Sequence, residues 1–220
     1  MRTKIKNEIK ATTAPYVEII NQIGETFLSP VWSVKEIMGV MYSSQKQLFF
    51  QDYINGIAYY YSNDSLDEKD VKTLVKKVSD SNNFETMTSI LDSVFFSHSK
   101  LSRAILGIIT GKFMRFDKLD YEDMVLISAM KDLFDEDLTQ FRKYCSYKPK
   151  GEIERIVYVE NYSGRDRIII EKLQNRGVLG RDMANRLSGL ALRFELTSVS
   201  DRLKGYVDVV RPSVVNEGNN

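Results

Sequence analysis

The sequence predicts a mainly α-helical protein with a small β part, organised as an N-terminal helical bundle followed by a small α+β module. Apolar residues recur at helical spacing as far as Cys145. A β-branched stretch at 153–159 and an alternating stretch at 190–197 are the best strand candidates. With 220 residues, of which 43% are hydrophobic, the chain can bury a substantial core.

Charge and composition argue against several classes of protein. The 31 basic and 30 acidic side chains give a net charge of +1, so no overall field attracts nucleic acid or an anionic membrane. One cysteine, Cys145, and one histidine, His98, cannot form a disulfide or a zinc site of the usual Cys/His composition. No apolar run reaches the ~18 residues of a membrane span, and the N-terminus lacks a signal-peptide core. We therefore expect a cytoplasmic protein.

No motif for catalysis or cofactor binding is recognisable. The chain has no glycine-rich phosphate loop, no dinucleotide fingerprint and no Gly-x-Ser-x-Gly elbow. Cys145 and His98 form the only available nucleophile–base pair, and a small buried hydrophobe is the better interpretation of Cys145. We expect a protein without cofactor, metal or small-molecule ligand, and not an enzyme.

Aromatic residues are frequent before residue 62. Their helical spacing is typical of core packing. A surface that binds a protein partner is the alternative, and a nucleic-acid stacking platform or a membrane-surface helix would use the same side chains. The candidate interface residues are Trp32, Phe49, Phe50, Tyr53 and Tyr60.

Three amphipathic helices are predicted between residues 65 and 116. The first begins at a capping box, Ser65 to Glu68, the second restarts near Asn83, and the third ends near Gly111. The first helix has a lysine-rich face, which we interpret as solvated, with phosphate binding as the alternative. Because such helices cannot bury their apolar stripes alone, we predict a helical bundle over residues 1–117.

An acidic segment, residues 117–137, follows the predicted bundle. It holds eight carboxylates against two lysines, a net charge of −6. Asp120 and Asp135 are each predicted to cap a helix, and the other carboxylates are expected to be solvated rather than to bind Mg²⁺ or Ca²⁺.

The remaining elements form the predicted α+β module, residues 118–210. A strand at 153–159 precedes a helix that Ser163 caps and Gly177 ends. A hairpin at 178–197 leads to a last helix capped by Thr197, and residues 211–220 are expected to be a disordered tail. A helix, a two-stranded wing and a second helix in this order make the module winged-helix-like.

The module resembles those of poorly characterised bacterial and phage proteins that pair an α-helical region with a C-terminal winged-helix-like module. The matching residues are the helix end Leu173 to Gly177, the strand end Phe194 to Thr197, and Leu203. The resemblance implies a regulatory role through protein contacts and no catalytic residues. About 17 residues (146–162) stand where a DNA-reading helix-turn-helix has a short turn.

The favoured hypothesis is a non-enzymatic interaction or regulatory protein of bacterial or phage origin, whose partner is another protein or a second copy. A peripheral membrane-associated protein is one alternative. A winged-helix DNA-binding regulator is another, because residues 150–211 carry twelve bases against nine acids. Its candidate nucleic-acid contacts are Arg165, Arg167, Lys172, Arg176, Arg181 and Arg186.

Overall fold

The computed structural model describes residues 44–61, 68–147, 155–181 and 191–216. The predicted fold class is confirmed, since helices dominate and one small antiparallel sheet accompanies them. The helices are α3 (Ser44–Tyr60), α4 (Glu68–Ser79), α5 (Phe84–Phe96), α6 (Lys100–Phe116), α7 (Tyr121–Ala129), α8 (Asp135–Cys145), α9 (Gly164–Asn175) and α10 (Ser198–Asn216). The strands are β1 (Ile156–Glu160), β2 (Leu179–Arg181) and β3 (Ala191–Leu196).

The sheet has the order β1-β3-β2, and both pairings are antiparallel. The strand predicted at 153–159 and the hairpin at 178–197 are therefore confirmed, although the hairpin connection, 182–190, lies outside the described residues. Phe194 of the central strand is fully buried, and its ring packs 5.6 Å from that of Tyr144 on α8. The name winged helix stays a prediction.

Helices α3 and α6 cross at very short range because glycines stand at the contact. A Cβ on Gly56 would lie 2.0 Å from the carbonyl oxygen of Ala104, and one on Gly107 would lie 2.0 Å from that of Tyr53. No larger residue fits at either position while the two backbones stay this close.

The predicted end of the third helix near Gly111 was wrong. Helix α6 continues to Phe116 and ends at Asp117, which adopts the left-handed conformation with φ 56°. Gly111 instead lies beneath the Tyr60 ring, where a Cβ would meet side-chain carbon at 2.7 Å. The glycine serves helix packing, which spacing along the chain does not reveal.

Three of the predicted caps are confirmed and one was wrong. Asp120 and Ser163 form capping boxes, and the Thr197 hydroxyl accepts a hydrogen bond from the Ser200 amide. Asp135 is the first residue of α8 rather than its cap. Its carboxylate accepts a hydrogen bond from the Leu101 amide, 2.9 Å away, and so satisfies the start of α6. The predicted cap at Ser65 lies outside the described residues.

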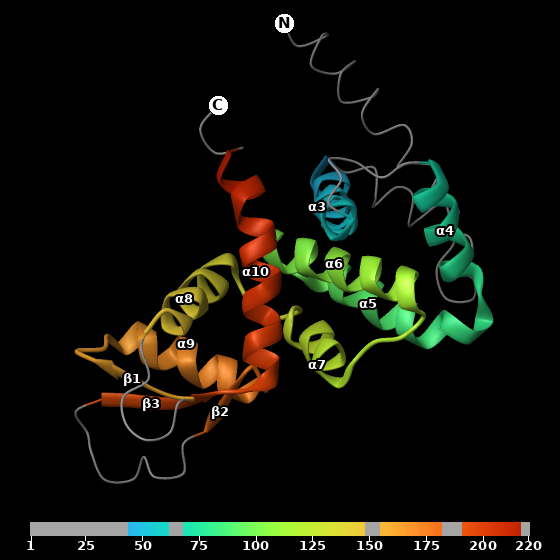
Figure 1. Ribbon diagram of the computed structural model, residues 1–220. Coiled ribbons are helices and arrows are strands. Elements are labelled where there is room, and N and C mark those ends of the chain that lie inside the picture. The colour runs from blue at the N-terminus through green and yellow to red at the C-terminus, as the bar shows by residue number, and fades with distance from the viewer. Residues whose placement is uncertain (1–43, 62–67, 148–154, 182–190, 217–220) are drawn as a thin grey trace, which may run out of the picture.

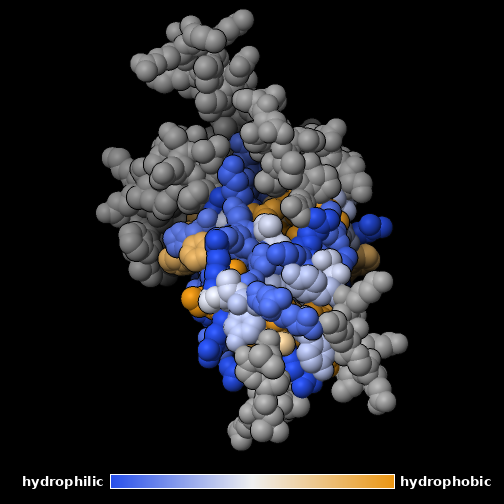
Figure 2. Space-filling view, turned by 90° about the vertical axis from the view of Figure 1, so that its left-hand side faces the viewer, coloured by the Kyte–Doolittle hydropathy of each residue, from blue (hydrophilic) through white to orange (hydrophobic). Residues whose placement is uncertain are grey.

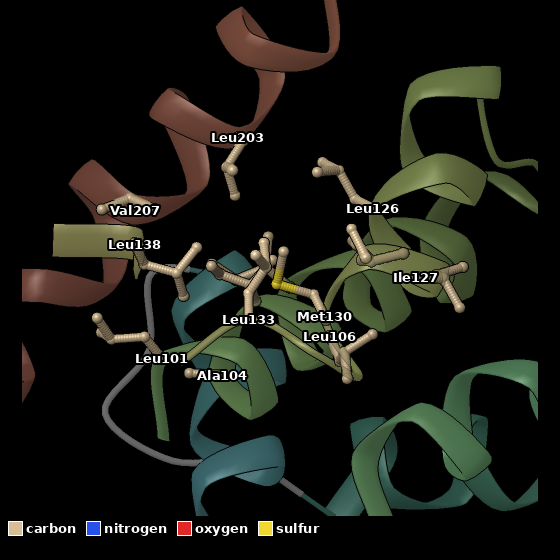
Figure 3. Packing of buried hydrophobic residues seen from close by; sticks show 14 of the residues in the cluster. Leu101, Ala104, Leu106, Leu126, Ile127, Met130, Leu133, Leu138, Leu203 and Val207 are labelled. Carbon is tan, nitrogen blue, oxygen red and sulfur yellow. The ribbon is translucent and has the colours of Figure 1, made fainter. Parts of the chain in front are cut away.

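One hydrophobic core joins the two predicted domains. Leu106 of α6, Leu126 of α7, Leu138 of α8 and Leu203 of α10 belong to a single cluster and are each fully buried (Figure 3). Figure 1 shows α10 running between the α3–α7 helices and the α8–α9–sheet region. The boundary predicted at residue 117 therefore lies within a continuous core.

Helix α10 includes residues 211–216, which belong to the predicted tail. Pro212 lies within this helix. Among the described helices, none has both the length and the apolar character that crossing a bilayer requires.

Candidate functional site

Two basic residues of α9, and Arg176 directly after it, form ion pairs with the acidic segment. Arg176 lies 2.7 Å from Asp132, Lys172 lies 2.5 Å from the buried Asp137, and Arg165 pairs with Glu136. We call these residues, Asp132, Glu136, Asp137, Arg165, Lys172 and Arg176, the α8–α9 belt. Two charged segments that the sequence presents separately thus neutralise each other.

The other candidate nucleic-acid contacts lie close to the belt. Arg167 pairs with Glu171 one turn along α9 at 2.9 Å, and Arg181 donates a hydrogen bond to Asn175 at 2.6 Å. Arg186 lies outside the described residues. In Figure 2, which shows the side of the molecule at the left of Figure 1, hydrophilic residues predominate. Among the described residues, the bases of the belt each lie next to a carboxylate.

The candidate interface aromatics separate into buried and accessible residues. Phe50 and Tyr53 are 2% and 0% exposed, so they pack in the core, as the core-packing interpretation expects. The Tyr53 hydroxyl donates a hydrogen bond to Thr110 at 3.0 Å, and burial raises the pKa of Tyr53. Trp32 and the side chain of Phe49 lie outside the described residues. Tyr60 remains half-buried and borders a cavity beside α10.

That cavity, which we call the α10 groove, has a volume of about 670 Å³. It lies where α10 approaches α3, α6 and α7. Its lining consists of Tyr59 and Tyr60 of α3, Ile108 of α6, Glu122 of α7, and Ser198, Asp201, Arg202, Gly205, Tyr206 and Val209 of α10. Three tyrosines from two helices therefore surround one open space.

A cluster of charged residues contacts Tyr206 and Arg202 of the α10 groove. Asp123, with no exposed side-chain surface, lies 2.6 Å from Lys112 and accepts a hydrogen bond from the Tyr206 hydroxyl at 2.7 Å. Asp120 pairs with Lys112 at 2.5 Å and with Arg202 at 2.9 Å. These contacts hold Tyr206 and Arg202, both residues of the groove, in defined positions.

The pKa values reflect this arrangement. Burial, followed by the hydrogen bond to Asp123, raises the pKa of Tyr206. Burial alone would lower the pKa of Lys112, but its hydrogen bonds to Asp120 and Asp123 raise it. The hydrogen bond from Lys112 likewise holds the pKa of Asp120 below its ordinary value. These shifts favour the protonated Tyr206 and Lys112 and the ionised Asp120, which are the forms that make the hydrogen bonds of the cluster.

The sequence interpretation missed the α10 residues of this groove. Gly205 interrupts an amphipathic helix, where a glycine costs roughly 1 kcal/mol relative to alanine, so its position is worth noting in the sequence. Val209, one turn further, is 48% exposed although it is apolar. The sequence could not place these residues beside α3, because that proximity depends on the tertiary fold.

Cys145 and His98 do not meet. The His98 ring stacks on Phe134, which precedes α8, with 6.2 Å between ring centroids, whereas Cys145 is the last residue of α8. Eleven helical residues span about 16 Å. Burial raises the pKa of the Cys145 thiol to about 12, which keeps it protonated and unreactive.

No group of three or more possible metal ligands gathers in the part of the chain that the structure describes. Carboxylates of the acidic segment contact lysines, arginines and backbone amides instead.

Comparisons with known proteins assign no family to this chain. No protein-family model, no curated protein and no solved structure matches it. Its own residues are therefore the basis on which a function can be proposed.

Proposed function

We propose that this chain is a non-enzymatic interaction protein that receives a segment of a partner protein in the α10 groove. The observation that carries the proposal is the groove itself, in which Tyr59, Tyr60 and Tyr206 border one cavity next to the exposed Val209. Tyrosine is enriched at protein interfaces because its ring offers a large contact area while its hydroxyl stays hydrated.

The support behind the groove favours binding further. The hydrogen bond from Tyr206 to Asp123 and the ion pair of Arg202 with Asp120 order both side chains before any partner arrives. Side chains that are already ordered lose little conformational entropy on binding, so more of the contact energy contributes to affinity.

The two alternatives receive less support. The belt pairs three of the candidate DNA-contact bases with carboxylates, so contact with phosphate would have to break those pairs. The membrane alternative depends on Trp32, which lies outside the described residues. The regulatory role, the cytoplasmic location and the bacterial or phage origin rest on the sequence alone and are part of this proposal.

Site-specific photocrosslinking in the native cell tests the proposal. A photoreactive residue at position 209, in the groove, is compared with one at position 168 on α9, because Val209 and Ile168 are both exposed apolar residues on helices, at 48% and 67%. We expect a defined protein adduct from position 209 and none of the same mass from position 168. Absence of an adduct at 209, or an adduct with nucleic acid, would contradict the proposal.

A further inference from the structure

Gly205 differs from the other glycines inside the described helices. Gly56, Gly107 and Gly111 each face atoms of this chain so closely that a Cβ would meet them at 2.0 to 2.7 Å. A Cβ on Gly205 would meet no atom of the described residues within 4 Å, although the residue lies on the α10 groove. Packing within the described chain therefore explains three of these glycines and leaves Gly205 unexplained.

A glycine in a helix interior has a cost. It destabilises a helix by roughly 0.5–1 kcal/mol relative to alanine, because it loses more backbone entropy on folding. The compensation seen elsewhere in this molecule is close helix contact, since Gly56 and Gly107 allow α3 and α6 to cross with their backbones nearly touching. An external helix could approach α10 at Gly205 in the same way.

The groove also has a chemical preference. Tyr59, Tyr60 and Tyr206 line the groove, and an aromatic ring attracts cations to its face. Arg202 and Asp201 are compensated by Asp120 and Arg155, at 2.9 and 2.6 Å. Glu122 then contributes a further carboxylate to the lining. Aromatic rings and a carboxylate in one lining together suit a lysine or arginine side chain.

We infer that the occupant of the α10 groove is a short, basic amphipathic helix of a partner protein. Its apolar side would lie against Ile108, Val209 and the bare backbone at Gly205, and one of its lysines or arginines would reach Tyr60 and Glu122. This binding mode is the insertion of an amphipathic helix into a groove. The inference rests on the proposed function and adds the chemistry of the partner.

Selection from a phage-displayed library of random 16-residue peptides tests this inference, with the purified full-length protein as bait. We expect the enriched peptides to share apolar residues at i, i+3, i+4 and i+7 and a net positive charge. A synthetic peptide of the enriched sequence should lose at least 100-fold in affinity for the Gly205→Trp variant, which fills the groove. It should lose about tenfold for Glu122→Gln.

Gly164→Trp is the matched control. Gly164, the first residue of α9, likewise has no described atom within 4 Å of an added Cβ, so its replacement adds the same ring at a site away from the groove and should leave affinity unchanged. Circular dichroism would establish that each variant is folded. If Gly205→Trp does not fold, Val209→Lys keeps the test informative, because it replaces an exposed apolar contact with a charge that repels a basic helix and should likewise lower the affinity.

The outcomes separate the inference from the proposed function. Acidic or neutral enriched peptides that Gly205→Trp displaces would overturn the basic partner while leaving the groove as a binding site. Peptides that are insensitive to Gly205→Trp, or no enrichment, would overturn both. Self-association that sedimentation detects in the wild type and not in Gly205→Trp would show that the occupant is a second copy, which also overturns the inference.

Discussion

Asp123 places a fully buried carboxylate between α6, α7 and α10. It contacts Lys112 at 2.6 Å, the Tyr206 hydroxyl at 2.7 Å and the Asp120 amide at 3.2 Å. A buried carboxylate is tolerated only when hydrogen bonds and an opposite charge replace its lost hydration. This one side chain therefore couples the start of α7 to a wall of the α10 groove.

The first prediction is that Asp123→Asn destabilises the protein far more than Asp120→Asn. Removing the charge leaves Lys112 partly uncompensated in a buried site, and breaking such a pair costs about 3 kcal/mol or more. Asp120 is 41% exposed, so the same change there should cost less than about 1 kcal/mol. Urea denaturation measures both values, and equal losses would contradict the prediction.

The second prediction is that Asp166 makes the free energy of unfolding depend on pH under acidic conditions. Hydrogen bonds from Ser163, and then from Tyr144 and Gln140, lower the pKa of Asp166 to about 2. The unfolded carboxyl has a pKa of about 3.9, so between these values the unfolded chain binds more protons. The stabilisation by Asp166 is complete above pH ~4 and is lost as the pH falls to ~2.

We therefore expect the free energy of unfolding to fall between pH 4 and pH 2 with a shallower slope in Asp166→Asn than in the wild type. Denaturant titrations at half-unit steps of pH measure the slope. Asp132→Asn, which removes an exposed carboxylate of the belt, is the matched control and should keep most of the slope. Identical slopes in wild type and Asp166→Asn would show that this carboxyl does not contribute.

At the scale of elements, glycines determine how closely another helix can approach α3, α6 and α10. The same substitution is expected to act in opposite directions at two of them. Gly107→Ala drives a Cβ into the Tyr53 carbonyl and should cost several kcal/mol, because two helices must separate. The added Cβ of Gly205→Ala meets no atom in the part of the chain that the structure describes, so this change should stabilise by about 0.5–1 kcal/mol through helix propensity.

Thermal unfolding measures this third prediction. A gain of about 1 kcal/mol raises the Tm of a protein of this size by roughly 2–4 °C. A destabilising Gly205→Ala would show that α10 packs against part of this chain at that position, and would remove the main reason for proposing a partner there.

The α8–α9 belt leads to the fourth prediction. Wild-type protein should not retard random duplex DNA at ~50 mM salt, because the bases of α9 are engaged by carboxylates. The double variant Asp132→Asn/Glu136→Gln releases Arg176 and Arg165 and should gain weak, salt-dependent binding. Gel retardation across a salt series measures it. Tight binding by the wild type, lost on Arg176→Ala, would favour the DNA-binding alternative instead.

At the scale of the whole molecule, one core connects both predicted domains. Leu203 and Val207 of α10 are 0% and 1% exposed and pack in the same cluster as Leu126 and Leu106 of the helical region (Figure 3). Helix α10 is the last described helix, yet it contacts α3, α6, α7 and α8. Its packing therefore joins the helical region to the α+β region.

The fifth prediction is that the described fold unfolds in one cooperative transition. Leu203→Ala should lower the free energy of unfolding by 2–5 kcal/mol and shift the far-UV and near-UV circular dichroism transitions together. Ile168→Ala, on the exposed face of α9, should stay within about 0.5 kcal/mol of wild type. Two separate transitions in the Leu203→Ala variant would show that the regions on either side of residue 117 are independent domains.

Local signals predicted the parts of the fold that depend on neighbouring residues. The capping box at Ser163 and Asp166, the left-handed Gly177 with φ 71°, and the alternating strand around Phe194 all lie where the sequence indicated. Each follows from backbone sterics or from hydrogen bonds a few residues apart, which a sequence displays directly.

Predictions that depended on distant contacts were wrong or incomplete for the same physical reason. Gly111 resembled a helix end because the Tyr60 ring above it could not be foreseen, and Asp135 resembled a cap of its own helix although it satisfies the amide of Leu101. Likewise, the sequence showed an acidic segment and basic α9 residues but not that they pair.

The amino-acid sequence by itself determined that this chain is mainly helical with one small sheet, and where most elements begin and end. Only the tertiary structure decided which charged side chains are engaged in ion pairs and which tyrosines line a groove together with Gly205. Periodicity and capping act within a few residues, whereas a binding surface forms from side chains that are distant in sequence and are brought together by burial of the core.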